Sequence, residues 1–455
     1  MMGRDSFLEA VKAAGIVGEG GAGFPAHVKY ATPGGAIDTV IANGCECEPL
    51  LHTDQHIMTH NGEAVLRGLR ALADATGAGR AVLGIKKKHA GLIQSLAEPA
   101  ARYRVSICPL DDFYPAGDEQ VLVREVTGRS VPPLGIPLAV NTVVANVGTL
   151  ANVDAALGGC GSPAPVTRKI LTVTGEVANP ALLRARIGAS LMECLEACGG
   201  VTTADPVFIL GGPMMGRVVA GQEALRSEVV TKTTGGLIVL PAGHHLHKNA
   251  VTPVSFMRRR AASACIQCRM CSDLCPRTLI GHPFETHKVM RAFAANSETG
   301  SDAGALAAMC CECGICEQYA CPMQLSPRRI NQAVKAELRD ANIRYEGPRD
   351  IREASTAWRE FRKIPVPRLA ARIGIGAYMR LETPFAGELQ PRGVTIPLRQ
   401  HIGAAAVPVV KPGDAVREGD CIGEIPENAL GARVHASING VVDHVTDSAV
   451  RISIR

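Results

Sequence analysis

Short apolar runs alternate with helix-period segments over the first 160 residues. Residues 39–42 and 81–85 are continuous apolar runs of the kind found in buried strands. Between them, Val65, Leu66, Leu69 and Leu72 recur at helical spacing. This alternation predicts an α/β domain with a parallel sheet, which we place at residues 1–160.

The pattern changes four times along the rest of the chain. Residues 161–245 predict a small α+β module, with strands at 170–175 and 207–210 and a helix at 190–197. Residues 250–335 contain two cysteine runs, and residues 336–390 are charged and read as a linker or strap. Residues 391–455 consist of short β segments broken by Pro and Gly, which predicts a small all-β domain.

The apolar spacing of Phe7, Leu8, Val11 and Ile16 predicts a short amphipathic helix at the start of the chain. We interpret it as a docking helix of the first domain, and a targeting or encapsulation helix is the alternative. Charged residues interrupt this segment, so a secretory signal is not expected.

Composition narrows the class of protein. The net charge is only +5 and aromatic residues make up 4% of the chain, so nucleic-acid binding is not expected. No apolar run of about 20 residues exists, so no membrane span is expected. Sixteen cysteines without a signal peptide indicate a reducing, cytoplasmic compartment.

The first cysteine run has the spacing of bacterial ferredoxins. Its residues are Cys265, Cys268, Cys271 and Cys275, and a proline follows the last of them. In two-cluster ferredoxins, three such thiolates hold one [4Fe–4S] cluster and the fourth ligates the other.

The second run is Cys310, Cys313, Cys316 and Cys321, again followed by proline. We therefore expect one cluster on Cys265, Cys268, Cys271 and Cys321, and the other on Cys310, Cys313, Cys316 and Cys275. Cys311 lies beside Cys310 but does not give the two-residue gap to Cys313. Structural zinc and disulfides are the alternatives, and zinc sites more often use two separated cysteine pairs.

Two loops of the first domain indicate a nucleotide or flavin. Residues 18–25 contain a G-x-G-x-x-G match that follows a helical pattern rather than a strand, so a Rossmann site is not expected. Such a loop still lets backbone N–H groups approach a phosphate or a flavin ring, and Lys29 supplies a positive charge nearby. A tight turn beside a solvated lysine is the alternative. Residues 43–49 follow a predicted strand and carry Glu46 and Glu48, which would bind ribose hydroxyls or form a solvated acidic turn.

Together these motifs resemble a family of electron-transfer flavoproteins. The first 160 residues are similar to the FMN- and NADH-binding subunit of respiratory complex I. They are more similar still to the C subunit of the Rnf complex and to cobalamin reductases of propanediol-utilisation microcompartments. Cys45 and Tyr30 stand where the complex I subunit has Asp and Trp.

The resemblance implies the fold and cofactors of the whole chain. It implies a complex-I-type FMN/NADH-binding α/β domain, a β-grasp (SLBB) module, a two-cluster ferredoxin domain and a C-terminal barrel-sandwich hybrid. The last lacks a lipoyl lysine because Asn439-Gly440 occupies its hairpin tip. The residues that the resemblance assigns to FMN and NADH are Gly18, Gly20, Gly21, Gly23, Phe24, Lys29, Asn43, Glu46, Glu48, Glu119, Asn146 and Thr149.

The same resemblance implies an NADH-dependent oxidoreductase with cobalamin as the electron acceptor, and no acid–base catalytic side chain is expected. An adenosyltransferase and microcompartment shell proteins are the implied partners. The position of the all-β domain at the end of the chain favours the cobalamin reductases over the Rnf subunits. An NADH:ferredoxin or flavodoxin oxidoreductase, a soluble Rnf-like protein and a non-enzymatic electron conduit are the alternatives.

His52, His56 and His60 fall at helical spacing just before Asn61-Gly62, where we expect their helix to end. We interpret them as a solvated helix face, with a zinc or cobalt site as the alternative.

Overall fold

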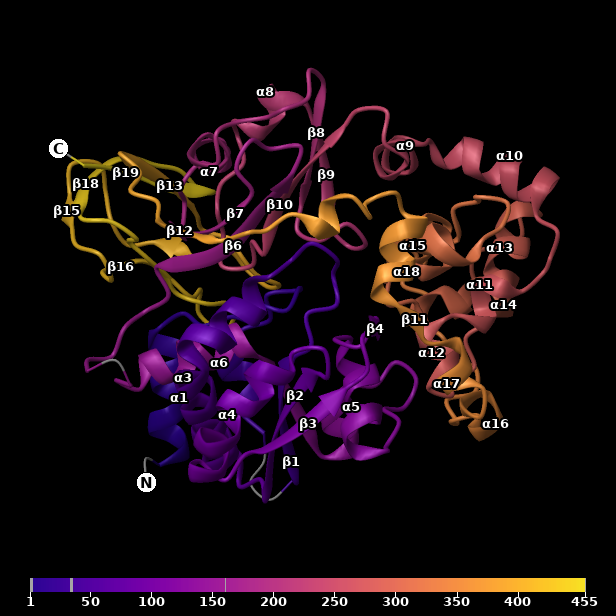
Figure 1. The fold of residues 1–455 in the computed structure, drawn as a ribbon, viewed down its shortest axis with the longest axis horizontal. Coiled ribbons are helices and arrows are strands. Elements are labelled where there is room, and N and C mark those ends of the chain that lie inside the picture. Colours follow the sequence, from indigo (N-terminus) through magenta and orange to yellow (C-terminus); the bar gives the residue numbers. More distant parts are fainter. Residues whose placement is uncertain (1–2, 33–35, 160, 455) are drawn as a thin grey trace.

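The computed structural model describes residues 3–32, 36–159 and 161–454. Figure 1 shows an indigo-to-purple N-terminal segment, a sheet-rich region that includes the C-terminus, and a helical region at the right that holds the cysteine runs. Among the described residues, no helix is both long and apolar enough to span a bilayer.

The N-terminal segment is built on the parallel sheet that the pattern predicts. Its strand order is β3-β2-β1-β5, and every neighbouring pair is parallel. All four strands therefore end at the same edge, which carries the loops singled out in the sequence. The sheet strands are β1 (Thr39–Gly44), β2 (Arg80–Lys86), β3 (Ser106–Leu110) and β5 (Thr142–Asn146). The remaining elements are α1 (Arg4–Ala13), α2 (Ala26–Tyr30), α3 (Thr53–Thr76), α4 (Ala90–Arg102), β4 (Phe113–Tyr114), α5 (Glu119–Thr127), a 3-10 helix (Pro137–Val140) and α6 (Val147–Ala156).

Helix α3 is longer than the sequence indicates. The expectation that the histidine helix ends at Asn61-Gly62 is wrong, because the backbone kinks at Asn61 and the helix continues to Thr76. The kink is local: Asn61 has φ −127°, outside the helical region. The imidazole rings of His56 and His60 are stacked 4.4 Å apart, and His56 also packs on Phe385 at 4.8 Å.

The second segment forms most of a six-stranded sheet of order β12-β7-β6-β10-β8-β9. Its helix begins with a capping box, in which Ser190 and Glu193 satisfy each other's backbone N–H groups. The sixth strand comes from the strap and pairs parallel with β7. The elements are β6 (Arg168–Gly175), β7 (Ala181–Arg186), α7 (Leu191–Ala197), β8 (Pro206–Leu210), β9 (Arg217–Ala220), α8 (Gly221–Leu225), β10 (Gly236–Pro241) and β12 (Phe385–Glu388).

The cysteine runs lie among short helices. They are α9 (His245–Val251), α10 (Val254–Ala264), α11 (Met270–Asp273), α12 (Pro276–Leu279), α13 (Thr286–Ala294), α14 (Asp302–Ala305), a 3-10 helix (Leu306–Met309), a π-helix (Ile315–Ala320) and α15 (Pro327–Asp340). Most cysteines of the two runs occupy the turns between these helices, so the backbone can fold around a cofactor instead of forming a continuous apolar core.

The strap is more ordered than a linker. Its elements before β12 are α16 (Glu353–Thr356), α17 (Arg359–Arg362), β11 (Ile364–Pro365), α18 (Val366–Arg372) and a 3-10 helix (Tyr378–Arg380). Strand β11 pairs antiparallel with β4 of the N-terminal segment, and β12 then joins the second segment. One connection therefore ties together two distant sheets.

The C-terminal segment contains two small sheets, of order β13-β19-β18-β15 and β14-β16-β17. Its buried Ile396 and Ile452 belong to the same apolar cluster as Val11 and Ile16 of the N-terminal segment. The strands are β13 (Gly393–Pro397), β14 (Val407–Pro408), β15 (Ala415–Val416), β16 (Cys421–Glu424), β17 (Val434–His435), β18 (Gly440–Val445) and β19 (Ala449–Ser453).

Close contact between α3 and α6 generates a stability prediction. A Cβ at Gly68 would lie 2.0 Å from the carbonyl oxygen of Leu150, whereas one at Gly91 in α4 would meet nothing within 4 Å. We expect Gly68→Ala to lower the free energy of unfolding by about 1–3 kcal/mol, because the helices must separate. Gly91→Ala is the matched control and should be neutral or slightly stabilising.

Denaturant unfolding measures both changes, and flavin content provides a second readout because α6 begins directly after Asn146. If Gly68→Ala unfolds at the same denaturant concentration as the wild type, the close helix contact is contradicted.

Candidate functional site

The acidic loop after β1 is fixed by its own asparagine. Asn43 accepts a hydrogen bond from the Cys45 backbone N–H at 3.1 Å. The Asn43 side-chain amide donates to the carbonyl oxygen of Gly117 at 2.9 Å. Asn43 therefore holds residues 43–49 against the third predicted loop, residues 114–119. Cys45, the residue that departs from the complex I pattern, is fully buried.

The glycine loop lies between α1 and α2, and the Gly18 N–H closes it by donating to the Phe24 carbonyl at 2.9 Å. Gly21 has φ +142° and Gly23 has φ +66°, conformations that side chains with a Cβ rarely adopt. A Cβ at Gly23 would also lie 3.1 Å from the Cα of His401. The loop ends on Phe24, an aromatic side chain that is 36% exposed.

Asn146 connects the glycine loop to the N-terminus of α6. Its side-chain oxygen accepts from the Gly148 N–H at 2.8 Å, and its amide donates to Asp54 at 2.9 Å. The Thr149 hydroxyl accepts from the Glu19 N–H at 3.0 Å. A Cβ at Gly20 would lie 3.5 Å from the Cβ of Asn146. The helix N-terminus and the glycine loop therefore face the same space.

Lys29 and Glu119 join two of the predicted loops directly. The Lys29 ammonium lies 2.5 Å from a Glu119 carboxylate oxygen, and both side chains are partly exposed. Neither group is buried deeply enough to be inaccessible, so a ligand phosphate can compete for the lysine.

The two glutamates of the acidic loop are electrostatically unusual. Burial raises the pKa of Glu48 to about 7, although the Met214 N–H donates to one of its oxygens at 2.8 Å. Burial also raises the pKa of Glu46, which accepts from the Glu48 N–H at 3.0 Å. The second oxygen of Glu48, Oε1, is buried and has no hydrogen-bond partner among the described residues. Because such an atom is costly unless a ligand satisfies it, this loop fits a polar cofactor.

A cavity of about 70 Å³ opens beside these glutamates. Its polar lining includes Lys86 and His52, and Met379 of the strap closes one side. The Lys86 ammonium is buried and lies 2.8 Å from Asp112. A carboxylate pair and a lysine thus flank the same space at the edge of the parallel sheet, the position where α/β proteins bind their ligands.

The structure brings the eight predicted cluster cysteines together in two sets of four. Cys265, Cys268, Cys271 and Cys321 line one cavity, and Cys275, Cys310, Cys313 and Cys316 line another. Each set combines three cysteines of one run with the last cysteine of the other, as the expected cross-ligation requires. Cys311 also lines the second set's cavity, so the choice of Cys310 over Cys311 as a ligand stays a prediction.

The chemistry of these cavities fits iron–sulfur clusters. The Glu312 N–H points at Cys310 Sγ at 3.4 Å, and the Leu325 N–H points at Cys321 Sγ at 3.4 Å. Hydrogen bonds to the sulfurs are one of the means by which proteins tune cluster potentials.

The zinc and disulfide alternatives find no support in the described part of the chain. The fifteen cysteines described there are all free thiols, and Cys160 lies outside the described residues. Within the same residues, no three His, Cys, Asp or Glu side chains are placed to hold a single ion. A four-iron cluster is held differently, because its thiolates surround a volume instead of one point.

The third loop contacts the cysteine segment directly. The Tyr114 hydroxyl donates to the carbonyl oxygen of Cys313 at 2.7 Å. Asp118 receives two hydrogen bonds from Arg277, at 2.7 and 2.9 Å, and also caps α5 by accepting from the N–H groups of Gln120 and Val121. Arg277 stands two residues after Cys275. Residues 114–119 therefore contact the glycine-loop lysine on one side and a cysteine cavity on the other.

Several contributing residues were missed by sequence reasoning. Glu19 forms an ion pair with Lys169 and accepts from Asn152 at 2.5 Å, which anchors the glycine loop. Asp54 holds Asn146, and Arg277 holds the third loop. Glu19 lies inside the glycine motif, which was a usable signal, but the partners of Asp54 and Arg277 are distant in sequence and leave no local pattern.

The raised pKa of Glu48 predicts a pH-dependent effect of Glu48→Gln. The folded flavin-free protein keeps the carboxyl protonated up to about pH 7, whereas the unfolded chain ionises at about 4.5. The stability that this proton contributes is present below pH 4.5 and is lost as the pH rises through 7. We expect the variant to gain stability over the wild type between pH 5 and 8, by at most about 3 kcal/mol.

Unfolding midpoints of the flavin-free proteins at both pH values measure this change. Glu427→Gln, at an exposed glutamate, is the control and should show no such trend. A pH-independent difference for Glu48→Gln would contradict the buried, protonated carboxyl.

The Asp118–Arg277 pair predicts a double-mutant result. Burial alone would raise the pKa of Asp118, but the charge and hydrogen bonds of Arg277 lower it. Asp118→Asn retains a helix cap and leaves Arg277 buried without its counter-charge, so we expect a loss of about 3 kcal/mol. Adding Arg277→Met should recover part of this loss in denaturant unfolding. A double variant no more stable than Asp118→Asn would show that the pair is not coupled.

Four domain families match the chain. They are the Nuo51 FMN-binding domain (residues 11–155), the SLBB domain (residues 170–218), the 4Fe-4S dicluster domain (residues 264–326) and the RnfC barrel sandwich hybrid domain (residues 382–453). The predicted fold class, FMN and two [4Fe–4S] clusters are confirmed at this level. All eight predicted ligand cysteines fall inside the dicluster match.

Full-length relatives extend the comparison. The chain is 42% identical to cobalamin reductase PduS of Citrobacter freundii over 98% of this chain and 95% of that one. It is 41% identical to cobalamin reductase PduS of Salmonella typhimurium over 98% of this chain and 96% of the relative. Identity is 34% with the RnfC-type component of the Na(+)-translocating ferredoxin:NAD(+) oxidoreductase complex of Acetobacterium woodii, over 60% of this chain and 58% of that component. With identity of this level along nearly its whole length, the chain belongs to the family of cobalamin reductase PduS.

Proposed function

We propose that this protein is an NADH-dependent FMN and iron–sulfur oxidoreductase that reduces cobalamin. The observation that carries the proposal is the position of residues 114–119. They contact Lys29 of the glycine loop through Glu119, and they contact the cysteine segment through Tyr114 and Asp118. The two halves of an electron-transfer protein are therefore held together by one loop.

The loops at the edge of the parallel sheet would hold FMN and NADH. The glycine-loop backbone (Gly18, Gly20, Gly21 and Gly23), Lys29, Asn43, Asn146 and Thr149 would bind the flavin. Phe24, Glu46, Glu48 and Glu119 would contact the nicotinamide nucleotide. When bound, FMN accepts a hydride from NADH and releases electrons singly, and the clusters carry one electron each.

The chain's own residues position these groups and control protonation around them. Glu48 is close to half protonated at neutral pH, so its free Oε1 can donate or accept one hydrogen bond to a bound ligand. Asn43 and Asn146 bind backbone groups at both ends of the site and keep the loops from moving apart. The eight cysteines supply the thiolates of the two clusters.

Cobalamin as the acceptor is supported by the two PduS relatives, which are named cobalamin reductases. On the same resemblance we propose that the protein works in the cytoplasm inside a bacterial microcompartment. An adenosyltransferase and shell proteins would be its partners there. Similarity to the RnfC-type relative favours a second candidate, a reductase of ferredoxin or flavodoxin.

The proposal predicts the following for the anaerobically purified protein. NADH should bleach the flavin absorbance, and added hydroxocobalamin should then be reduced to cob(II)alamin. Bleaching without cobalamin reduction would favour ferredoxin or flavodoxin as the acceptor. Absence of bleaching would leave a non-enzymatic electron conduit.

Lys29→Met tests the flavin site itself. We expect the flavin affinity to fall about tenfold or more, because a charge-assisted contact to phosphate is lost and Glu119 is left unpaired. Lys411→Met, at an exposed lysine of the C-terminal segment, is the matched control. Equal flavin content in both variants would remove Lys29 from the site.

A further inference from the structure

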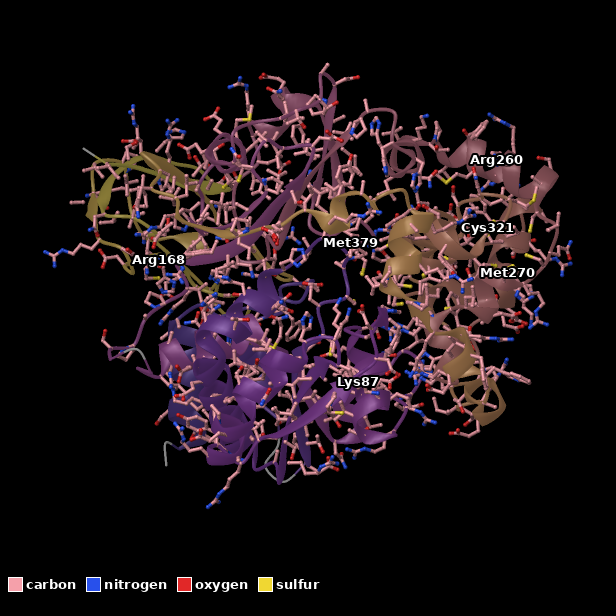
Figure 2. The ribbon with its side chains drawn as sticks, viewed as in Figure 1. Lys87, Arg168, Arg260, Met270, Cys321 and Met379 are labelled. Atoms are coloured by element: carbon pink, nitrogen blue, oxygen red, sulfur yellow. The ribbon has the colours of Figure 1, made fainter. Side chains whose placement is uncertain are left out.

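We propose that one surface of the cysteine segment is the docking site for a protein electron acceptor with an acidic face. The inference rests on the proposed function and adds the kind of partner and the place where it binds. The residues of this methionine–arginine surface are Arg260, Ile266, Arg269, Met270 and Met323. Figure 2 shows Arg260 and Met270 in the same region as Cys321, far from Lys87 and Arg168.

The two cysteine cavities differ in their exposure. Cys275, Cys310 and Cys313 are buried, and the Tyr114 hydroxyl of the N-terminal segment bonds to the backbone of Cys313. By contrast, Cys268 of the other set is exposed. One cavity therefore lies against the FMN-binding domain, and the other lies toward solvent.

The wall of the solvent-side cavity is thin and apolar. Ile266, Arg269 and Met323 line this cavity directly, together with the cysteines. Ile266 is 62% exposed, Met270 43% and Met323 36%. Apolar side chains of this size are normally covered in a soluble protein, and methionine adapts to varied partner surfaces. A partner seated on them would place its redox centre one side-chain layer from the cysteines.

The charge around this wall is uniformly positive in sequence. No Asp or Glu occurs from residue 229 to residue 272, a stretch that contains Arg258, Arg259, Arg260 and Arg269. Arg260 donates to the carbonyl oxygens of Met323 and Gln324, at 3.1 Å each, and forms no ion pair with the described residues. Arg269 has one long contact with Glu285, 3.4 Å, and Lys288 and Arg352 surround the same glutamate.

This combination selects the chemistry of the partner. Arginines around an apolar centre attract a protein with acidic residues around its own redox centre, and they orient it before contact. Each NADH that is oxidised to NAD+ and a proton supplies two electrons, so two one-electron acceptors are reduced in turn. The partner therefore carries a one-electron centre, such as a protein-bound corrin, haem or iron–sulfur cluster.

Two forms of cytochrome c provide matched probes. The native protein is basic and the succinylated protein is acidic, while both carry the same one-electron haem. With the anaerobic holoprotein, we expect calorimetric titration at low ionic strength to show about tenfold tighter binding of the succinylated form, and this difference should shrink as salt is added. NADH-dependent haem reduction should show the same preference.

Charge reversal should invert the preference. In the double variant Arg260→Glu and Arg269→Glu, native cytochrome c should bind more tightly than the succinylated form. Arg399→Glu with Arg417→Glu makes the same change of charge at exposed positions of the C-terminal segment, and it should behave as the wild type. Ile266→Glu leaves the contacts of Arg260 in place and should weaken binding of the succinylated form, so the test does not depend on the folding of one variant.

Equal binding of both cytochromes by the wild type, or identical behaviour of the two double variants, would overturn the proposal. Binding to phosphatidylglycerol vesicles that is lost in Arg260→Glu with Arg269→Glu would assign the surface to a membrane and would also overturn it. Binding needs no NADH, so a failure of NADH to bleach the flavin refutes the proposed function separately from the docking surface.

Discussion

The buried ion pair between Asp118 and Arg277 holds together the two parts of the protein that must exchange electrons. Its carboxylate also caps α5, so the same group orients a helix of the N-terminal segment and a turn of the cysteine segment. Tyr114 adds a second contact from the same loop. Electron transfer depends steeply on separation, and a bidentate pair between rigid elements fixes separation better than a flexible linker would. The position of the strap reinforces this junction, because β11 pairs with β4 at Tyr114.

Burial gives the candidate cofactor site its electrostatic character. Glu46 and Glu48 lie close together in a loop with little solvent, which raises the pKa of both. Lys86, Lys29 and Lys169 are nearby, but each is already paired with Asp112, Glu119 or Glu19. The site thus contains one uncommitted carboxylate oxygen, Oε1 of Glu48, beside these paired charges. Polar groups arranged in this way favour a ligand that completes the network over solvent that enters it.

Local sequence signals predicted what depends on local geometry. The Cys-x-x-Cys-x-x-Cys spacing defines a loop that wraps a cluster, so both sets of four could be assigned before any fold was known. The parallel sheet followed from the period of its strands and helices. The Asp118–Arg277 pair could not be found in this way, since 159 positions separate its partners. The end of α3 was misjudged because Asn61-Gly62 is a common stop signal, and packing of Gly68 against Leu150 carries the helix past it.

The sheet of the second segment is completed by a strand that the ribosome makes much later than the others. Strands β6 to β10 lie within residues 168–241, but their edge partner β12 begins at Phe385. During synthesis the edge of β7 is therefore open while about 140 further residues emerge, and open strand edges are prone to pair with other chains. The modules that the sequence suggests are consequently not independent folding units. A fragment cut at the apparent boundary of the second segment would retain its core and lose the strand that protects its edge.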